Sequence, residues 1–114
     1  MSKADQQDAH RYEALKRSLV DLGMLRRGSL VRRFMPCGKP GCRCQAASPE
    51  LHGPYYQWTR KVGGKTATLR LSEREARLLE QWVVNGRRLD RLVAQMEGVS
   101  LRRTDRLLKK LRRS

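Results

Sequence analysis

The sequence lacks long apolar runs and has few aromatic residues. Aromatic side chains make up 5% and hydrophobic residues 39% of its 114 residues. No stretch reaches the ~18 uninterrupted apolar residues that a membrane span needs. The N-terminal stretch MSKADQQDAHRYEALK has no apolar signal-peptide core. We therefore expect a cytoplasmic protein with a modest core and no membrane partner.

Acidic residues are nearly missing from the middle of the chain. Residues 25–71 contain ten basic residues and one acidic residue, Glu50. Residues 100–114 are also strongly basic, whereas residues 1–24 and 72–99 each balance to zero, and the formal net charge of the chain is +15. The two basic stretches predict surfaces that face a polyanion, although the general solubility of a basic protein would also explain them.

This scarcity of carboxylates also bears on catalysis. The sequence shows no paired carboxylates, no phosphate-binding loop and no serine nucleophile in a recognisable turn. A nuclease would need acidic metal ligands, and the middle of the chain offers Glu50 alone. We therefore expect a protein without enzymatic activity.

Hydrophobic periodicity predicts the elements at the two ends of the basic middle stretch. Apolar residues at steps of three and four indicate a helix over 5–22, and Gly23 would end it. Ser72 and Glu75 form a capping box, so a second helix should begin at about Glu73. We expect close packing or a break at Gly86, an end at Gly98, and a last helix capped by Ser100.

Between these helices, the segment before Pro36 favours an extended strand, and the stretch PYYQWTRKVGGKTATLRL predicts a β-hairpin. Gly63 and Gly64 suit a two-residue turn, because glycine adopts positive φ readily. That turn would pair Trp58 with Leu69 and Tyr56 with Leu71. One face of the hairpin would then be mostly apolar and the other polar and basic.

The chain has three cysteines, and all lie in the eight residues CGKPGCRC. With the histidine of HGPYYQW, these residues give the spacing C-x4-C-x-C-x7-H. Thiolate and imidazole groups supplied from a tight turn are the ligands that structural zinc prefers. The expected ligands are Cys37, Cys42, Cys44 and His52, of which His52 is the least secure because its imidazole could instead cap the HGP turn.

Three alternatives to zinc remain open at this cluster. The cysteines could hold no metal. A disulfide would leave one cysteine unpaired in a reducing compartment. A catalytic Cys–His pair would need a third group to orient the imidazole.

With the zinc site included, the expected fold class is α+β. It comprises an N-terminal helix (1–24), a small three-stranded antiparallel sheet stapled by a Cys/His metal site (25–71), a packing helix (72–99) and a basic C-terminal helix (100–114). We expect one domain overall.

The motifs RGSL, CGKPGCRC, HGPYY and GGK occur here in that order. In this respect the sequence resembles a bacterial family of small basic proteins, a domain of unknown function, over about residues 26–95. The resemblance implies a mobile-element or DNA-transaction context, because such proteins are met beside transposase and integrase genes. It also implies that the three cysteines and His52 are signature positions.

We expect a non-enzymatic accessory protein that binds nucleic acid, most simply duplex DNA. Residues 92–111 resemble a helix-turn-helix, although a basic amphipathic helix would explain them equally well. The residues expected to contact nucleic acid are Arg26, Arg27, Arg32, Arg33, Lys39, Arg43, Lys61, Lys65, Arg70, Arg102, Arg103, Arg106, Lys109 and Lys110.

Two other functions stay open. A structured-RNA binder would stack bases on exposed aromatic residues. A protein-interaction module would dock on an acidic partner, such as a transposase or recombinase subunit, through the leucines of 101–111. The same leucine stripes could serve a homodimer.

Overall fold

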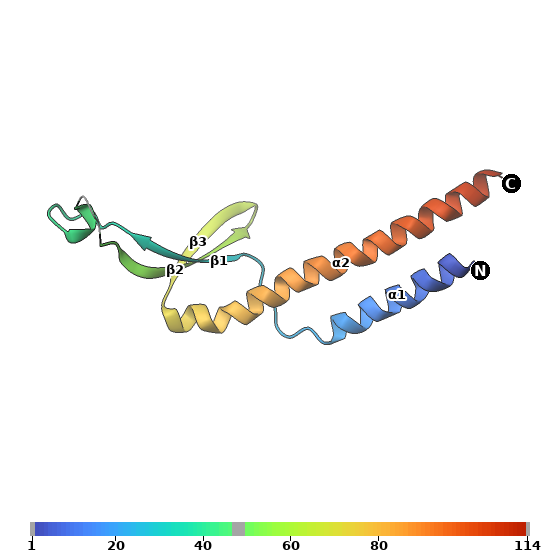
Figure 1. Ribbon diagram of the computed structural model, residues 1–114, viewed down its shortest axis with the longest axis horizontal. Coiled ribbons are helices and arrows are strands. Elements are labelled where there is room, and N and C mark those ends of the chain that lie inside the picture. The colour runs from blue at the N-terminus through green and yellow to red at the C-terminus, as the bar shows by residue number, and fades with distance from the viewer. Residues whose placement is uncertain (1, 47–49, 114) are drawn as a thin grey trace. The chain divides into compact units, whose positions relative to one another are not determined.

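The computed structural model describes residues 2–46 and 50–113. The elements follow in the order α1 (Lys3–Val20), β1 (Ser29–Met35), the short 3-10 helix η1 (Arg43–Gln45), β2 (His52–Val62), β3 (Lys65–Leu71) and α2 (Glu73–Arg113) (Figure 1). This confirms the α+β class, with an N-terminal helix, a three-stranded antiparallel sheet and C-terminal helical structure. The chain forms two compact units: a helical unit of residues 1–24 and 87–114, and a sheet unit of residues 25–86.

The predicted hairpin is present with the predicted register. β2 pairs with β3 so that Trp58 lies opposite Leu69 and Tyr56 opposite Leu71. The turn residues Gly63 and Gly64 have φ values of 55° and 80°, where side chains larger than glycine are strained. β1 pairs antiparallel with the other edge of β2, which gives the strand order β1-β2-β3.

The core of the sheet unit lies between one face of the sheet and the first half of α2. Trp58 and Leu71 from the sheet pack with Ala76 and Val83 from α2, and Leu30, Tyr56 and Leu79 lie at the margin of this cluster. Full burial of a leucine or valine side chain, such as those of Leu71 and Val83, contributes about 1.5–3 kcal/mol. The apolar alternation of the hairpin therefore fixes which face of the sheet α2 covers.

The start of α2 is capped as predicted. The backbone N–H of Ser72 donates to Glu75 Oε1 at 2.9 Å, and the backbone N–H of Glu75 donates to Ser72 Oγ at 3.1 Å. These two hydrogen bonds satisfy donors that a helix start otherwise leaves unpaired. The Ser72 backbone N–H, and to a smaller extent the Ser72 side chain, lowers the pKa of the Glu75 carboxyl by hydrogen bonding to it.

α2 is unbroken at Gly86. Of the two alternatives predicted there, close packing is confirmed and a break is wrong. A Cβ at this position would collide with the backbone carbonyl oxygen of Arg26. The contact holds the segment before β1 against α2. The same segment contacts α2 a second time, because the backbone N–H of Arg26 donates to the Trp82 carbonyl at 2.9 Å.

The predicted end at Gly98 and the helix-turn-helix are wrong. α2 is one helix of 41 residues that runs through Gly98 and Ser100, so residues 92–111 contain no turn. Ser100 does not cap a helix; its carbonyl accepts a hydrogen bond from Thr104 Oγ1 at 2.7 Å. Val99 is only 3% exposed, and we attribute the continuity of the helix to its burial, which outweighs the cost of about 1 kcal/mol for a helical glycine.

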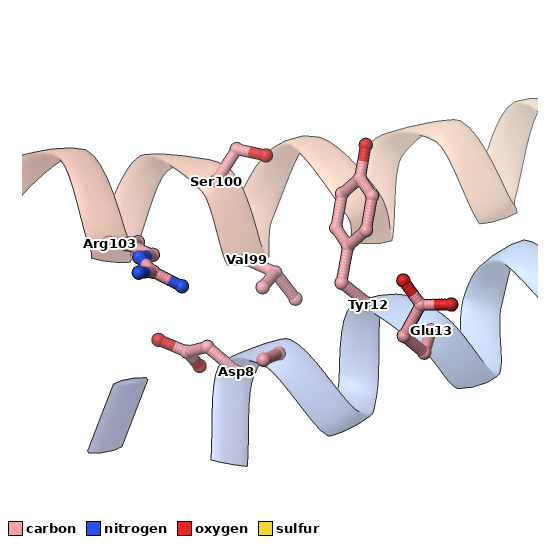
Figure 2. A pocket seen from close by; sticks show the side chains of 7 residues that line it. Asp8, Tyr12, Glu13, Val99, Ser100 and Arg103 are labelled. Atoms are coloured by element: carbon pink, nitrogen blue, oxygen red, sulfur yellow. The ribbon is translucent and has the colours of Figure 1, made fainter. Parts of the chain in front are cut away.

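In the helical unit, α1 packs against the second half of α2. Leu15 of α1 forms a buried cluster with Leu92 and Val99, and Tyr12, Leu19, Leu22 and Met96 surround it. Figure 2 shows Tyr12 and Val99 beside a pocket of about 310 Å³ between the two helices. Within the described residues, no helix combines the length and the apolar character that a membrane span requires.

Candidate metal centre and basic surfaces

The end of the β1–β2 pair brings the cysteine stretch and His52 together. Met35, the last residue of β1, lies opposite His52, the first residue of β2. Cys37 follows Met35 by two residues, so the chain leaves β1 beside the histidine. Gly41 has a φ of 78°, which lets the chain reverse before Cys42.

A short helical turn resolves how a Cys-x-Cys pair can point to one side. Residues Arg43–Gln45 form η1, in which the backbone N–H of Gln45 donates to the Cys42 carbonyl at 2.9 Å. The turn replaces the alternation of an extended strand, which would send the two side chains to opposite faces. Cys42 and Cys44 therefore both face His52 and Cys37.

The four ligand atoms form a compact cluster in which all lie within 4.8 Å of one another. Cys42 Sγ is 3.1 Å from His52 Nε2, and Cys44 Sγ is 3.5 Å from Cys37 Sγ. With Zn–S bonds of about 2.3 Å, a tetrahedral zinc site separates its sulfurs by roughly 3.8 Å. These separations are close to those of a Cys3His metal site, and all four predicted ligands belong to the cluster.

The cluster contains one buried cysteine, and its surroundings shift the pKa values of two of its thiols. Cys44 is 3% exposed, and the backbone N–H of Cys37 donates to its sulfur at 3.1 Å. Hydrogen bonds from the Cys44 backbone and from His52 lower the pKa of the Cys42 thiol to about 6. Burial raises the pKa of the Cys44 thiol. Cys42 is thus the readiest thiolate ligand near neutral pH.

A disulfide and a catalytic Cys–His pair are less well supported than a metal site. All three cysteines are free, so the structure contains no disulfide among them. The 3.1 Å contact between Cys42 and His52 would suit a catalytic pair, but the nearby carboxylate of Glu50 lies 3.6 Å from Arg43 Nη1 instead. The cysteine cluster is therefore a site that can hold a metal ion.

The predicted basic residues of the sheet unit fall into distinct places. The strand register puts Arg33, Lys61 and Arg70 on the face of the sheet turned away from the core. Here the Arg70 guanidinium lies 3.8 Å from the centre of the Tyr55 ring, and Arg33 donates to Gln57 Oε1 at 3.4 Å. We call this face, with these three basic residues, the outer basic face.

The remaining basic residues of the sheet unit lie elsewhere. Lys39 and Arg43 belong to the exposed cysteine loop. Arg32 shares the core face of the sheet with Tyr56 and lies 5.3 Å from the Phe34 ring. Lys65 begins β3, and Arg26 and Arg27 precede β1.

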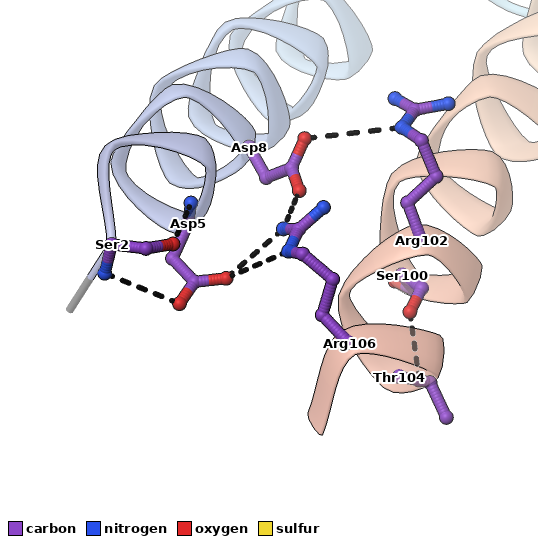
Figure 3. Close-up of polar contacts among 7 residues, drawn as sticks. All are labelled: Ser2, Asp5, Asp8, Ser100, Arg102, Thr104 and Arg106. Carbon is purple, nitrogen blue, oxygen red and sulfur yellow. Dashed lines mark hydrogen bonds and ion pairs between the residues drawn. The ribbon is translucent and has the colours of Figure 1, made fainter. Parts of the chain in front are cut away.

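Two arginines predicted to contact nucleic acid form ion pairs within the helical unit. Arg106 forms ion pairs with Asp5, at 3.0 Å, and with Asp8, while Arg102 lies 3.9 Å from Asp8 (Figure 3). The pKa of the Asp5 carboxyl is lowered, chiefly by its hydrogen bond from Arg106. Arg103 lines the pocket near Asp8, whereas Glu13 lies at the other end of the pocket beside Tyr12 (Figure 2). Lys109 and Lys110 are exposed.

Sequence reasoning missed Arg60. The alternation of β2 places its side chain on the same face as Trp58, where a charge is unexpected. The structure shows why it is tolerated there: its guanidinium lies 4.4 Å from the centre of the Trp58 ring, and that of Arg26 lies 4.6 Å from the same ring. An arginine two residues after a tryptophan in the same strand lies on the same face of the sheet, and this spacing could have signalled the stacking.

Comparison with known proteins identifies the family of the chain. The family described as a domain of unknown function, DUF6788, matches residues 5–81. These residues include α1 from its third residue on, the whole sheet, the cysteine cluster and the start of α2. No curated protein and no solved structure matches the chain. Because the match covers more than half of its residues, the chain belongs to the DUF6788 family.

Proposed function

We propose that this protein is a non-enzymatic, zinc-stapled nucleic-acid-binding protein whose preferred partner is duplex DNA. The observation that carries the proposal is the charge of residues 25–71, where Glu50 alone opposes ten basic residues. Glu50 is already close to Arg43. Several of the arginines are held in place by aromatic rings, which fixes their position and leaves their positive charge.

Zinc is the metal that the ligand set favours. Three thiolates and one imidazole in a tetrahedral arrangement are typical of structural zinc sites, in which no position is left open for a substrate. The site would join the end of β1 to the start of β2. It would thereby hold the cysteine loop, with Lys39 and Arg43, beside the sheet without taking part in chemistry.

Duplex DNA is favoured over structured RNA by the state of the aromatic residues. Trp58 is 7% exposed and belongs to the core, so it offers no surface for a base. Tyr55 is the aromatic residue of β2 on the outer basic face, and the Arg70 guanidinium already covers its ring at 3.8 Å. Base stacking is therefore left to Phe34, which is 50% exposed, and Trp82, which is 37% exposed, whereas the basic residues still offer phosphate contacts.

The proposal is tested by a salt titration. The zinc-loaded protein is titrated with matched duplex DNA, single-stranded DNA and duplex RNA at several salt concentrations. If about six to eight phosphates are neutralised, the logarithm of the duplex DNA affinity should fall against the logarithm of salt with a slope of about −5 to −7. A slope near zero, or weak binding to all three probes, would overturn the proposal.

Matched variants locate the contacts. The double variant Arg33→Gln, Arg70→Gln should weaken DNA binding about tenfold or more and make the salt slope shallower by about two. The double variant Arg11→Gln, Arg17→Gln changes the net charge equally but lies on α1, where the charges balance. It should leave the slope unchanged; an equal effect of both pairs would contradict a specific basic face.

A protein-interaction role is the second candidate, and one observation favours it. Leu101, Leu107 and Leu111 of α2 are 53–62% exposed, which is costly for a helix without a partner. An acidic partner such as a transposase or recombinase subunit would fit the surrounding basic residues. The mobile-element context itself rests on the motif resemblance. Deletion of residues 100–114 would abolish partner binding but not DNA binding under this alternative.

A further inference from the structure

The second half of α2 has two sides, and α1 lies along one of them (Figure 1). The covered side carries Leu92, Met96 and Val99. A second row of residues recurs at steps of three and four from residue 94 to residue 111, so its members share one side of the helix. This row, which we call the open stripe, consists of Ala94, Glu97, Leu101, Thr104, Leu108 and Leu111.

The open stripe is apolar at its leucines and faces away from α1. All six of its residues are exposed, and Leu101 and Leu111 are 62% and 60% exposed. Because a helix turns by about 100° per residue, the middle of the stripe lies roughly 150° around α2 from the covered row. In the described residues of the helical unit, α1 is the only other element, so the stripe has no cover there.

The charged residues of this part of α2 lie mostly outside the open stripe. Arg102 and Arg106 form ion pairs with aspartates of α1, and Arg103 lines the pocket between the two helices. These three arginines therefore lie toward the covered side. Glu97 is the charged residue within the stripe, and it has no ion-pair partner in the described part of the chain. A fitting partner is therefore mostly apolar and brings a positive charge to Glu97.

One end of the open stripe is hollow, and the other end protrudes. An open hollow of about 470 Å³ is lined by Ala94, Glu97, Gly98, Ser100, Leu101 and Thr104. It lies where the small residues Ala94 and Gly98 leave the helix surface low. Leu108 and Leu111 stand out from the surface nearer the C-terminal end. The stripe thus carries both a hollow and the bulky side chains that would fill one.

A two-fold axis through the middle of the stripe would bring these two ends together. It places a second copy of the helix antiparallel to the first. Leu111 of one copy then faces Ala94 of the other, and Leu108 faces Glu97. Every such contact is made twice, because both copies use the same surface. The stripe is therefore complementary in shape to itself when the two helices run in opposite directions.

Charge also favours the antiparallel arrangement. Residues 100–114 carry seven basic residues and one acidic residue. Parallel copies would lay these basic ends side by side, where like charges repel. Antiparallel copies place the basic end of one beside Glu97 of the other, and Arg112 follows Leu108 by one turn, which brings its positive charge to this carboxylate. An acidic partner would instead add negative charge beside Glu97.

We propose that this protein forms a two-fold symmetric dimer in which the open stripes of two copies pack antiparallel. The contact spans residues 94–111, which is about 27 Å of helix. Its alternating steps of three and four are the spacing of a two-stranded coiled coil. The inference goes beyond the proposed function, because the stripe contains none of the residues predicted to contact nucleic acid.

Sedimentation equilibrium of the full-length, zinc-loaded protein without nucleic acid tests the dimer. We expect the mass to rise from that of one chain to that of two as the protein concentration increases from micromolar to millimolar. The same measurement at higher salt should give equal or tighter association, since the contact is apolar and added salt screens the repulsion between the two basic chains. A single-chain mass at every concentration and salt would overturn the proposal.

Matched variants locate the contact. Leu101→Gln and Leu111→Gln should each weaken dimerisation at least tenfold, because each removes apolar surface that the dimer buries. Leu78→Gln is the control, since Leu78 is 68% exposed on the same helix but lies outside the stripe. All three leucines are exposed, so circular dichroism should show unchanged helix content. Equal dimerisation in all three variants would place the dimer contact elsewhere and overturn the proposal.

Photo-crosslinking determines the direction of the two helices. The variant Leu107→p-benzoylphenylalanine leaves the open stripe intact and carries the crosslinker beside it. It is mixed with isotope-labelled protein, and mass spectrometry identifies the peptides joined between copies. Antiparallel packing predicts crosslinks to about residues 91–100 of the other copy. Crosslinks to residues 104–111 would show parallel packing and contradict the proposed arrangement.

The dimer and the proposed function can fail separately. Salt-steep DNA binding by a protein that stays monomeric would refute this inference and leave the proposed function standing. It would also leave the exposed leucines to a different protein partner. A dimer that loses its association in Leu101→Gln but shows no salt-dependent DNA binding would support this inference and overturn the proposed function.

Discussion

Two glycines of α2 have opposite surroundings although they share one helix. A Cβ at Gly86 would collide with the backbone of Arg26, whereas at Gly98 its nearest neighbour would be the end of the Arg102 side chain at 3.9 Å. Alanine is a better helix former than glycine by about 0.5–1 kcal/mol. Whether a glycine-to-alanine substitution stabilises or destabilises the protein therefore depends on the space around that glycine.

We predict that Gly86→Ala lowers the free energy of unfolding by about 1–3 kcal/mol, the usual cost of overpacking. Gly98→Ala should raise it by about 0.5–1 kcal/mol. Urea denaturation followed by circular dichroism measures both. Stabilisation by Gly86→Ala would contradict the close approach of Arg26 to α2.

At the scale of elements, the pairing of α1 with the second half of α2 depends on charge as well as on leucines. Arg106 bridges Asp5 and Asp8 (Figure 3), and Asp8 is among the buried residues. A buried charge is tolerated only when it is paired. The ion pairs of Arg106 with the two aspartates therefore restrict the position of α1 along the second half of α2 more than the apolar contacts alone would.

We predict that this pairing weakens in acid. Because the pKa of Asp5 is lower in the folded protein than its ordinary value of 3.8, the charged carboxylate stabilises the fold above about pH 4. That stabilisation is lost as the pH falls below 4 through the folded-state pKa. Thermal melts between pH 5 and 2 should show the loss.

Asp5→Asn should make the melting temperature less dependent on pH in this range. Some dependence will remain, because the pKa of Glu75 is also lowered, by the hydrogen bonds at Ser72. The variant Glu75→Gln separates the two contributions. Identical pH profiles for Asp5→Asn and the wild-type protein would show that the Arg106 contact contributes nothing to stability.

Local patterns explain which elements could be predicted from the sequence. The hairpin follows from an alternation of apolar and polar residues around Gly63 and Gly64, and the start of α2 follows from Ser72 and Glu75. Both signals lie within a few residues of the structure they determine. The continuity of α2 at Gly98 could not be predicted in this way, because it depends on the burial of Val99 against α1, far away in sequence.

The same distinction applies to the candidate sites. All four metal ligands fall within residues 37–52, so their spacing alone predicted the cluster. The ion pairs of Arg106 with Asp5 and Asp8 join residues about a hundred positions apart, so counting charges along the chain could not predict them. Arg60 was missed because periodicity describes which face a residue occupies and not which ring it stacks on.

At the scale of the whole molecule, a bound metal should raise stability by mass action. Zinc at about 1,000 times its Kd stabilises a fold that binds it only in the folded state by about 4 kcal/mol. We therefore predict that a chelator lowers the melting temperature of the zinc-loaded protein.

The two histidines of the chain provide a matched pair of variants for this effect. His52→Ala should reduce zinc affinity at least tenfold in competition with a chromophoric chelator, because it removes one of four ligands. His10→Ala should not, since His10 lies exposed on α1. Equal zinc affinity in both variants would exclude His52 as a ligand.

The helical unit is assembled from two stretches that are separated in the chain, residues 1–24 and 87–114. During synthesis, α1 therefore leaves the ribosome well before the part of α2 that covers Leu15 and Tyr12. Residues 25–86 are translated in between, which takes on the order of 3–12 s at about 5–20 residues per second. For that interval the apolar side of α1 has none of its native α2 contacts, whereas all four metal ligands are already available once His52 has emerged. The order of translation thus favours completion of the cysteine cluster first and of the helical unit last.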